Sequence, residues 1–476
     1  MYTGVYGILP VIGGKMKKSF LVFTLFCLLI LVSCVNRPKN EDETDTGGNV
    51  TDGDGNSAAD SDSADDSDSA LNPEDEDTFS GQSDEDETQA DEEPTEPDES
   101  ESETVTDLSK SETANCYIVQ TAGDYSFDAT VRGNGRIVEN IDFANEKLDP
   151  VDVGLVWQSN NGLVDSLKLK DGRIYFSAKN LSGNALIAAL DEAGNIIWSW
   201  HIWLSDEDMT DVKTADGVMV MDRNLGATSL SFNSSRSHGL LYQWGRKDPF
   251  PASPIVSGGT TSTMPVPVYD AEGNEVEIAH SSWENAENNT LEYAISNPTT
   301  VLSNNSQSSE CRDWLRKEFS NPALWGGSDG EKSLFDPCPA GYRVPKAGTF
   351  DFFTSSGGYE TDIAGFSVYD INHDGITDGN DYRNGWNIIL DPESDSYSYF
   401  PAATRYDGSY AMLMGSKTGL WGNYWYADAD DSEDTYLPCG AYALAFQFGD
   451  SVSASPKATG GRADGYSVRC VKESAE

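Results

Sequence analysis

A stretch of 72 residues, from Glu41 to Glu112, most limits what this chain of 476 residues can fold into. It contains 29 Asp and Glu residues against a single lysine, Lys110, and its only aromatic residue is Phe79. Such a segment buries too little apolar surface to offset the conformational entropy lost on ordering. The sequence therefore predicts a disordered acidic linker here, with the folded domains after it.

The net charge of the whole chain is −49. A surface of this sign repels phosphate backbones, which argues against nucleic acid as a partner. Self-repulsion also extends the linker, so a stalk that holds a folded head away from a membrane is the expected role. The alternative is that the acidic run sequesters cations, although such runs are usually just solvated.

The first residues have the pattern of an export signal. Two lysines precede an apolar run from Phe20 to Leu31, which is typical of a secretory signal peptide and too short for a mature helix that spans about 30 Å of bilayer. The following Leu-Val-Ser-Cys, ending at Cys34, resembles a bacterial lipobox and implies lipidation of Cys34 after cleavage. Ordinary cleavage with an incidental cysteine is the alternative. Residues 1–33 are assigned to a mis-called start plus this signal, and residues 34–112 to the lipidated linker.

From Thr113 the composition changes to short β-rich runs separated by Gly, Asn and Asp turns. Short strands without helical periodicity favour an all-β sandwich of the immunoglobulin-like kind, assigned to residues 113–204. The segment Asp191–Asn195 is expected to be a hairpin loop, with Gly194 in the left-handed conformation. The expected strands cover Tyr117–Val119, Tyr125–Val131, Val153–Trp157, Arg173–Ala178, Ala185–Leu190 and Ile196–Leu204.

In the last of these runs, Ile196, Trp198, Trp200 and Ile202 alternate with other residues, which places them on one face of a strand. A row of tryptophans can be a platform for sugars. Such a row is more often part of a core or of a domain interface. We therefore expect burial of this row.

Four further motifs carry a resemblance to a known family: Met221–Ala227, Tyr242–Phe250, Asp336–Pro345 and Gly465–Val471. Together they resemble the major paralogous domain family of exported bacterial proteins, first named from Fibrobacter succinogenes, over roughly residues 197–474. Asn115–Val119 and Arg132–Gly135 look like the module that often precedes that domain. The resemblance implies a fold like that of C-type lectins and formylglycine-generating enzymes, without a settled activity.

This resemblance implies an α+β, C-type-lectin-like domain over residues 205–476. Its long loops, notably residues 251–308, would carry recognition. A helix from Glu310 to Phe319, capped by Ser309, is predicted from the apolar spacing of its residues. The other expected elements are a strand at Gly217–Asp222, a short helix near Phe350–Phe353, and closing strands at Trp421–Tyr426, Tyr442–Phe448 and Tyr466–Val471.

The cysteines follow from the same resemblance. Of the seven, Cys27 leaves with the signal and Cys34 is lipidated, so five remain. Because the first and last strands of the implied fold are neighbours, we expect a disulfide between Cys338 and Cys470. Cys311 with Cys439 is a second candidate pair, and Cys116 is left open. No Cys-x-x-Cys pair occurs, so structural zinc is not expected.

The segment from Asp370 to Asp381 resembles a calcium loop of the dockerin or thrombospondin type. Calcium requires six or more oxygen ligands, and a glycine at the sixth position, here Gly375, permits the sharp turn. The twelfth position is Asp where such loops commonly have Glu. A polar loop without an ion is the alternative, and one repeat argues against a cohesin-binding role. The candidate Ca²⁺ ligands are Asp370, Asn372, Asp374, the carbonyl of Ile376, Asp378 and Asp381.

No catalytic residues are predicted. Gly326–Gly330 matches the nucleophile-elbow pattern, but no buried strand precedes it. Nothing matches the copper-binding cysteine pair of the formylglycine-generating enzymes. The charged motifs Asp222-Arg223-Asn224 and Arg246-Lys247-Asp248 are interpreted as buried ion pairs that hold loops. The acidic loop Asp428–Asp434 fits no motif and is interpreted as solvated.

The sequence thus predicts a multidomain surface lipoprotein: a signal peptide and acidic linker, an all-β sandwich, and a lectin-like domain. We interpret it as a non-enzymatic binding or adhesion protein, lipid-anchored in the outer membrane and exposed at the cell surface. Its ligand would be an extracellular glycan or protein. The alternatives are a structural or tip subunit of a surface filament or cell-envelope assembly, and, less favoured, an enzyme.

Overall fold

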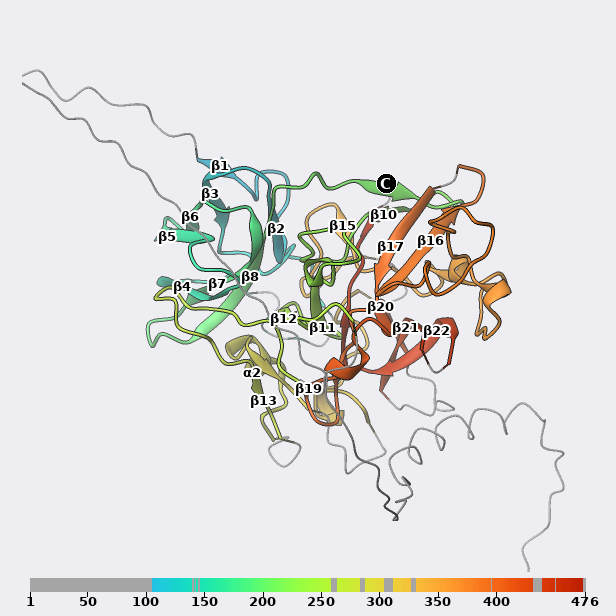
Figure 1. The fold of residues 1–476 in the computed structure, drawn as a ribbon. Helices are drawn as coiled ribbons and strands as arrows, with labels where there is room; N and C mark the ends of the chain where they lie inside the picture. Colours follow the sequence, from blue (N-terminus) through green and yellow to red (C-terminus); the bar gives the residue numbers. More distant parts are fainter. Residues whose placement is uncertain are drawn as a thin grey trace, which may run out of the picture. The chain divides into compact units, whose positions relative to one another are not determined.

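The computed structural model describes residues 105–473, apart from 139–140, 142, 144–145, 258–262, 283–286, 304–310, 327–330, 395, 431–438 and 450. All described residues belong to one unit, Thr95–Glu476. Within these ranges the chain is built mostly from strands, and its one α-helix is α2 (Leu291–Ser296). The β-rich character expected from the sequence is confirmed (Figure 1).

Two four-stranded sheets form the N-terminal part. The first has the order β1 (Thr106–Asp107), β3 (Gly123–Asp128), β6 (Arg173–Ala178) and β5 (Val164–Lys170). The second has the order β2 (Cys116–Val119), β8 (Ile196–Ser205), β7 (Ser182–Leu190) and β4 (Asp152–Gln158). The ring centroids of Phe127 in β3 and Trp200 in β8 lie 5.2 Å apart, so the two sheets pack against each other.

The hairpin between β7 and β8 has the geometry that its loop predicts. The strands pair antiparallel from Ser182 opposite Ser205 to Leu190 opposite Ile196. Gly194 has a φ of +81°, a left-handed conformation that glycine adopts without steric cost. The Asp191 carboxylate accepts hydrogen bonds from the amides of Ala193 (2.9 Å) and Asn195 (2.8 Å), which closes the turn.

The C-terminal part contains several smaller sheets around one large one. The large sheet has the order β12, β11, β23, β20, β21, β22, with β18 pairing to β23 and β19. A second has the order β15, β24, β10, β9, and two pairs, β13–β14 and β16–β17, complete the part. The bounds are β9 (Asp211–Lys213), β10 (Met219–Met221), β11 (Leu240–Gln243), β12 (Phe250–Pro251), β13 (Ala279–His280), β14 (Thr300–Val301), β15 (Tyr342–Arg343), β16 (Gly385–Asp391), β17 (Ser396–Pro401), β18 (Tyr406–Asp407), β19 (Met412–Leu413), β20 (Trp421–Asp430), β21 (Gly440–Gln447), β22 (Ser453–Gly461), β23 (Gly465–Ser467) and β24 (Val471–Lys472).

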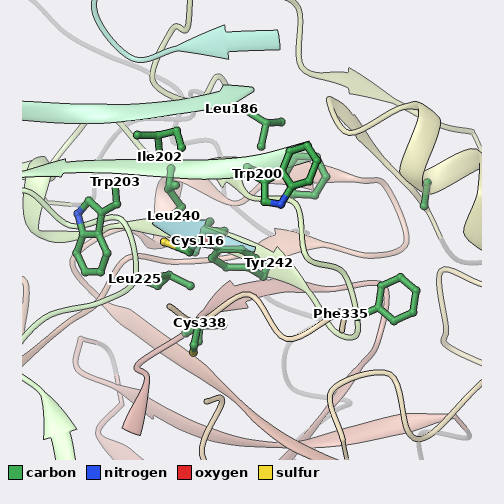
Figure 2. Close-up of a cluster of buried hydrophobic side chains, with 14 of the residues drawn as sticks. Cys116, Leu186, Trp200, Ile202, Trp203, Leu225, Leu240, Tyr242, Phe335 and Cys338 are labelled. Atoms are coloured by element: carbon green, nitrogen blue, oxygen red, sulfur yellow. The ribbon is translucent and has the colours of Figure 1, made fainter. Parts of the chain in front are cut away.

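Strand β8 is buried on both faces and contacts both the N-terminal sheets and the C-terminal part. Trp198 and Trp200 are fully buried on one face, so the expectation that the tryptophan row is buried is confirmed. On the other face Ser199 donates a hydrogen bond to Asp248 (2.6 Å), and the Trp203 indole donates to the carbonyl of Ala227 (3.0 Å). One hydrophobic cluster therefore includes residues from both parts, as Figure 2 shows for Trp203, Leu225, Leu240 and Tyr242.

A second hydrophobic cluster lies under β16 and β17 and is rich in aromatic side chains. Phe353 and Phe400 meet edge to face at 4.8 Å, and Trp386 lies 4.8 Å from Phe446 of β21. Phe353 belongs to a short 3-10 turn, Asp351–Phe353, where the sequence predicts a short helix. Side chains of β16 and β17 belong to this cluster, and so does Tyr382 just before β16, which fixes the end of the preceding loop.

The helix predicted from Glu310 to Phe319 is wrong for the residues that the structure describes there, 311–319. Only a 3-10 turn at Lys317–Phe319 occurs, and Phe319 is 46% exposed. The Asp313 carboxylate accepts a hydrogen bond from the amide of Leu315, a local bond that competes with helix formation. Trp314 donates to the carbonyl of Trp244 (2.7 Å), so tertiary contacts decide this segment. Ser309 and Glu310 lie outside the described residues.

The ordered chain begins earlier than Thr113. Residues Thr106 and Asp107 form β1 and pair in parallel with Tyr125 and Ser126 of β3. The Arg173 guanidinium lies 2.5 Å from the Asp107 carboxylate, so an acid counted with the linker is an ion-pair partner in the first sheet. The prediction of a disordered linker is therefore wrong for its last residues, and residues 34–104 lie outside the described part.

Helix is scarcer than an α+β domain implies for residues 205–476. In the described ranges its complete helical elements are α2 and the 3-10 turns at Ser235–Ser237, Lys317–Phe319, Asp351–Phe353, Ile363–Gly365 and Gly415–Lys417, and Glu287 and Asn288 also have a 3-10 conformation. The expected loop at residues 251–308 contains β13, α2 and β14. Helix α2 is fixed by Thr290, whose hydroxyl accepts from the amide of Tyr293 and caps its first turn.

Candidate functional site

The segment Asp370–Asp381 lies between two isolated β-bridges, at Phe366 and Val368, and the pair β16–β17, drawn in orange in Figure 1. Its acidic side chains bind amides of their own loop. Asp370 Oδ2 accepts from the amide of Gly375 (2.7 Å), and Asp374 Oδ1 accepts from that of Ile376 (2.8 Å). Gly375 has a φ of +80°, so the sharp turn predicted at the sixth position is present.

Asp381 closes the loop. Its two carboxylate oxygens accept hydrogen bonds from the amides of Ile371 and Asp378, both at 2.9 Å, and the side chain is fully buried. The next residue, Tyr382, is also buried, and its ring stacks on Phe448 at 4.5 Å. This burial raises the pKa of the Tyr382 phenol. The end of the loop is therefore anchored in the second hydrophobic cluster.

The structure brings the six predicted calcium ligands into one loop but does not bring their carboxylates together. Within the described residues, no group of three or more His, Cys, Asp or Glu side chains has an arrangement that could hold a metal ion. One observation fits a cation: Asp370 Oδ1 is shielded from solvent and has no hydrogen-bond partner in the described part of the chain. The candidate ligand atoms of this loop are all oxygens, which Ca²⁺ prefers as ligands.

A pair of tyrosines lies beside this loop. Tyr369 and Tyr397 stack with ring centroids 4.1 Å apart and planes 12° apart, and Tyr397 is 46% exposed. The edge of His373, in the loop itself, packs against Tyr369 at 5.7 Å. We call Tyr369 and Tyr397 the tyrosine stack. It is an exposed aromatic surface next to a polar, oxygen-rich loop.

Backbone pairing fixes the tyrosine stack. Tyr397 in β17 is opposite Ile389 in β16, while the amide of Tyr369 donates to the carbonyl of Asn387 (2.7 Å) on the other side of β16. The two rings therefore meet across β16. Sequence analysis missed this pair, because residues 28 positions apart in sequence meet only through that three-stranded arrangement. An aromatic residue directly before the predicted loop was the only signal.

The two charged motifs are buried, as their interpretation requires. The Arg223 guanidinium binds the Asp222 carboxylate (2.8 Å), and Lys247 Nζ lies 2.5 Å from the carboxylate of Asp248. Arg246 instead donates to main-chain carbonyls, including that of Thr300 (2.7 Å). These side chains connect segments of the fold, and none of the three cations is more than 3% exposed.

Two disulfides are present, and they join the cysteines that the sequence analysis paired. Cys338 and Cys470 have Cα atoms 6.0 Å apart, next to the antiparallel pairing of β15 with β24. Cys311 and Cys439 have Cα atoms 5.0 Å apart. The remaining described cysteine, Cys116, is unpaired and buried.

Other predicted features lie partly or wholly outside the described residues. These are Cys34 and the signal peptide, Gly327–Gly330 of the elbow-like sequence, and Asp431–Asp434 of the second acidic loop. In the described part of that loop, Asp428 accepts a hydrogen bond from the amide of Ala347 (2.6 Å). That carboxylate therefore ties β20 to a neighbouring loop and is not simply solvated.

Comparison with known proteins identifies no relative: no family model, no curated protein and no solved structure matches this chain. The resemblance to the major paralogous domain family therefore stays a prediction. Among the described residues, no helix has the length and apolar character needed to cross a membrane.

Proposed function

We propose that this chain is a lipid-anchored cell-surface protein of the outer membrane that binds a glycan or another surface molecule without transforming it. In this proposal Cys34 carries the lipid, the acidic linker is the stalk, and residues from 105 onward are the binding head. An N-terminal sandwich and a lectin-like C-terminal domain would make up that head. Two disulfides in a β-rich head are in keeping with an oxidising, extracytoplasmic location.

The tyrosine stack is the observation that carries the binding proposal. Tyrosine presents a large, rigid, apolar face together with a hydroxyl, and it is enriched where proteins contact ligands. Tyr397 keeps 46% of its surface exposed while its ring stacks on Tyr369. A preorganised ring of this kind loses little conformational entropy on binding. A sugar ring is a suitable partner for such a face, and the neighbouring loop offers acceptors for its hydroxyl groups.

Calcium in the loop is part of the same proposal. Asp370, Asn372, Asp374, the carbonyl of Ile376, Asp378 and Asp381 would hold the ion. The unpaired Asp370 Oδ1 supports it. Because Asp381 and Asp374 bind loop amides, the ion would share oxygens that are already hydrogen-bonded. Bound calcium would stiffen the loop beside the tyrosine stack.

The proposal is tested with a glycan array probed by the full-length protein in detergent, with and without a chelator. Tyr397→Ala should reduce binding at least tenfold. Tyr410→Ala is the matched control, because Tyr410 is 73% exposed but follows β18, away from the stack in sequence and pairing. Absence of any glycan signal in both conditions, or equal binding by the Tyr397 and Tyr410 variants, would count against the proposal.

Calcium binding is tested separately by thermal unfolding with added Ca²⁺ or chelator. The wild-type protein should melt several degrees higher in calcium, since a ligand that binds only the folded state stabilises it. Asp374→Ala should abolish that difference, and Asp428→Ala, in the other acidic loop, should retain it. A calcium-dependent shift that survives Asp374→Ala would exclude this loop as the site.

The edge strand β4 favours the second candidate function, a subunit of a surface filament or envelope assembly. β4 pairs with β7 on one side, and on its other side the described chain supplies only Tyr269, opposite Gln158. The residues from Val153 to Val156 carry no charge. Natural edge strands are usually blocked by charge, proline or covering segments, because an open edge accepts a further strand.

Sedimentation of the protein at increasing concentration distinguishes this second function. Strand addition at β4 predicts concentration-dependent assembly that Val156→Lys removes, while Lys213→Gln, at the exposed end of β9 in another sheet, leaves it unchanged. A protein that stays monomeric at all concentrations would reject the filament function for identical subunits and leave the binding proposal standing.

A further inference from the structure

A shallow pocket of about 320 Å³ lies over the first N-terminal sheet, away from the tyrosine stack. It is lined by side chains of β3, β5 and β6, among them Asp124, Lys168, Lys170, Tyr175 and Ser177. We call it the sheet pocket. Nothing in the proposed function uses it.

Register places its polar groups side by side. Lys168 of β5 is opposite Tyr175 of β6, and Lys170 is opposite Arg173. Residues two apart on a strand point to the same face and lie about 7 Å apart, so the two lysines share one face of β5. Tyr175 lies on the same face, in β6, which is between β5 and β3. Both lysines are exposed and Tyr175 is half-buried. The pocket therefore combines two ammonium groups with one aromatic ring.

A bulge shapes this wall of the pocket. The pairing of β5 with β6 shifts between Asp165 and Lys168, and Ser166 in between has a φ of +56°. A non-glycine residue in the left-handed region is uncommon and costs energy, and bulges redirect neighbouring side chains. Here the bulge brings Ser166 to the pocket as well as Lys168.

The two lysines have no ion-pair partner among the described residues, although acids surround them. Arg173 binds Asp107, Lys179 pairs with Asp165, and the Asp124 carboxylate accepts from the Ser177 hydroxyl (2.5 Å). The nearby carboxylates are thus engaged elsewhere. In a chain with a net charge of −49, two neighbouring unpaired ammonium groups form a local site for an anion.

Asp124 decides which anion fits. A ligand whose side chains offer mainly carboxylates, such as an acidic peptide, would be repelled by the Asp124 carboxylate. A sugar acid carries hydroxyl donors that Asp124 and the two serines can bind, an anionic group for the lysines, and a ring face for Tyr175. We propose that the sheet pocket binds an acidic saccharide, such as a uronic acid or a sulfated sugar, with the anionic group on Lys168 and Lys170.

Alternatively, the lysines serve only to keep the edge strand β5 from pairing with other chains, a common use of edge lysines. In that case any polyanion would bind weakly and without regard to Tyr175. Val105 also lines the pocket, and acidic residues precede it in the sequence. A peptide with that acidic sequence would then bind the lysines as well as a saccharide does. These alternatives give different results in one binding experiment.

The experiment measures binding of an oligogalacturonate to the full-length protein in detergent by titration calorimetry. Its methyl ester has the same sugar chain without the charges, and a peptide with the sequence of residues 96–104 supplies charge without sugar. We expect the oligogalacturonate to bind at least tenfold more tightly than either. Lys168→Gln/Lys170→Gln should weaken it at least tenfold, and Tyr175→Ala about fivefold.

Lys213→Gln/Lys457→Gln is the matched control, because it removes the same charge from other sheets, and it should leave the affinity unchanged. Equal binding of the peptide and the oligogalacturonate, or no effect of Tyr175→Ala, would overturn the saccharide in favour of general charge attraction. Tighter binding of the peptide would assign the pocket to the chain's own acidic segment. Because none of these residues touches the tyrosine stack, failure here leaves the glycan proposal at Tyr397 unaffected.

Discussion

Single buried polar side chains fix loops of this molecule by donating to main-chain carbonyls, some distant in sequence and some nearby. The amide of Asn115 donates to the carbonyls of Leu334 (2.7 Å) and Asp336 (2.9 Å). Lys332 Nζ donates to three carbonyls, those of Cys338, Pro339 and Tyr342, at 2.7 to 2.8 Å. A buried donor left unpaired costs about 1–3 kcal/mol, so these contacts specify one arrangement of the loops.

Gly133 shows how closely these segments approach. Its φ is +51°, and an added Cβ would lie 2.1 Å from the carbonyl oxygen of Leu334. We expect Gly133→Ala to lower the free energy of unfolding by about 3 kcal/mol, because strain and a main-chain clash add. Gly194→Ala is the control: φ is also positive, at +81°, but the space is open, so about 1 kcal/mol is expected. Equal losses in urea unfolding would contradict the close approach.

His201 predicts a pH dependence. It is fully buried, its Nε2 lies 2.8 Å from Asn184 Oδ1, and burial lowers its pKa from 6.5 to about 3. A lowered pKa means that the folded state holds the neutral ring. Its contribution to stability is therefore complete above pH 6.5 and is lost as the pH falls toward 3, by about 2 kcal/mol at pH 5.

Stability of the wild type and of His201→Gln, measured from pH 7.5 to 5, tests this. The variant should be less stable at pH 7.5 but should lose about 2 kcal/mol less on acidification. Burial raises the pKa of the Asp336 carboxyl to about 6, so protonation of Asp336 stabilises the folded protein as the pH falls. This effect is the same in the wild type and in His201→Gln, and it cancels in the comparison. Parallel pH profiles would show that His201 does not titrate on unfolding as proposed.

Among the elements, β8 and the β15–β24 pair do most to organise the fold. Trp200 of β8 packs on the first sheet, while Trp198 and Trp203 contact the C-terminal part. β24 pairs with both β15 and β10, and Cys470 beside it is bonded to Cys338. The chain's last strand is thus attached to two segments that lie well before it in the sequence.

Removal of the Cys338–Cys470 disulfide is expected to destabilise the protein strongly. The bond closes a loop of 132 residues, for which the loss of loop-closure entropy in the unfolded chain corresponds to about 5 kcal/mol. We expect Cys338→Ala/Cys470→Ala to lower the denaturant midpoint by a corresponding amount. Cys116→Ala, which alters a buried but unpaired cysteine, should cost about 1 kcal/mol. Similar losses in the two proteins would contradict this role of the bond.

For the molecule as a whole, the N-terminal sheets and the C-terminal part share one hydrophobic cluster. The predicted boundary between residues 204 and 205 falls at the end of β8, whose side chains contact both sides. Separating the parts would expose Trp203 and leave Asp248 and Lys247 without Ser199. Neither part is expected to be fully stable without the other.

Calorimetry of the full-length protein should therefore show one cooperative transition for the head, with equal calorimetric and van't Hoff enthalpies. A chain that ends at Ser205 should lack a cooperative transition and should bind a hydrophobic dye. Two resolved transitions in the full-length protein, or cooperative unfolding of the shortened chain, would show that the parts fold independently.

Local patterns were sufficient for much of the fold. The runs at Tyr117–Val119, Arg173–Ala178 and Ile196–Leu204 are strands, and the Asp191–Asn195 hairpin has its predicted glycine. β5 was missed, because its bulge at Ser166 and its alternating lysines weaken the pattern. The predicted helix was wrong over the described residues 311–319, because the Asp313 carboxylate and the contacts of Trp314 override its apolar spacing.

The sequence alone determined where many of the strands form, that the tryptophan row is buried and where a polar loop turns, because alternation and turn residues act over a few neighbours. Only the tertiary structure decided which surfaces meet. The burial of β8 on both faces, the meeting of Tyr369 with Tyr397, and the placement of Lys168 and Lys170 beside Tyr175 each depend on strand order and register. Those depend on contacts between residues far apart in the chain, which no local pattern contains.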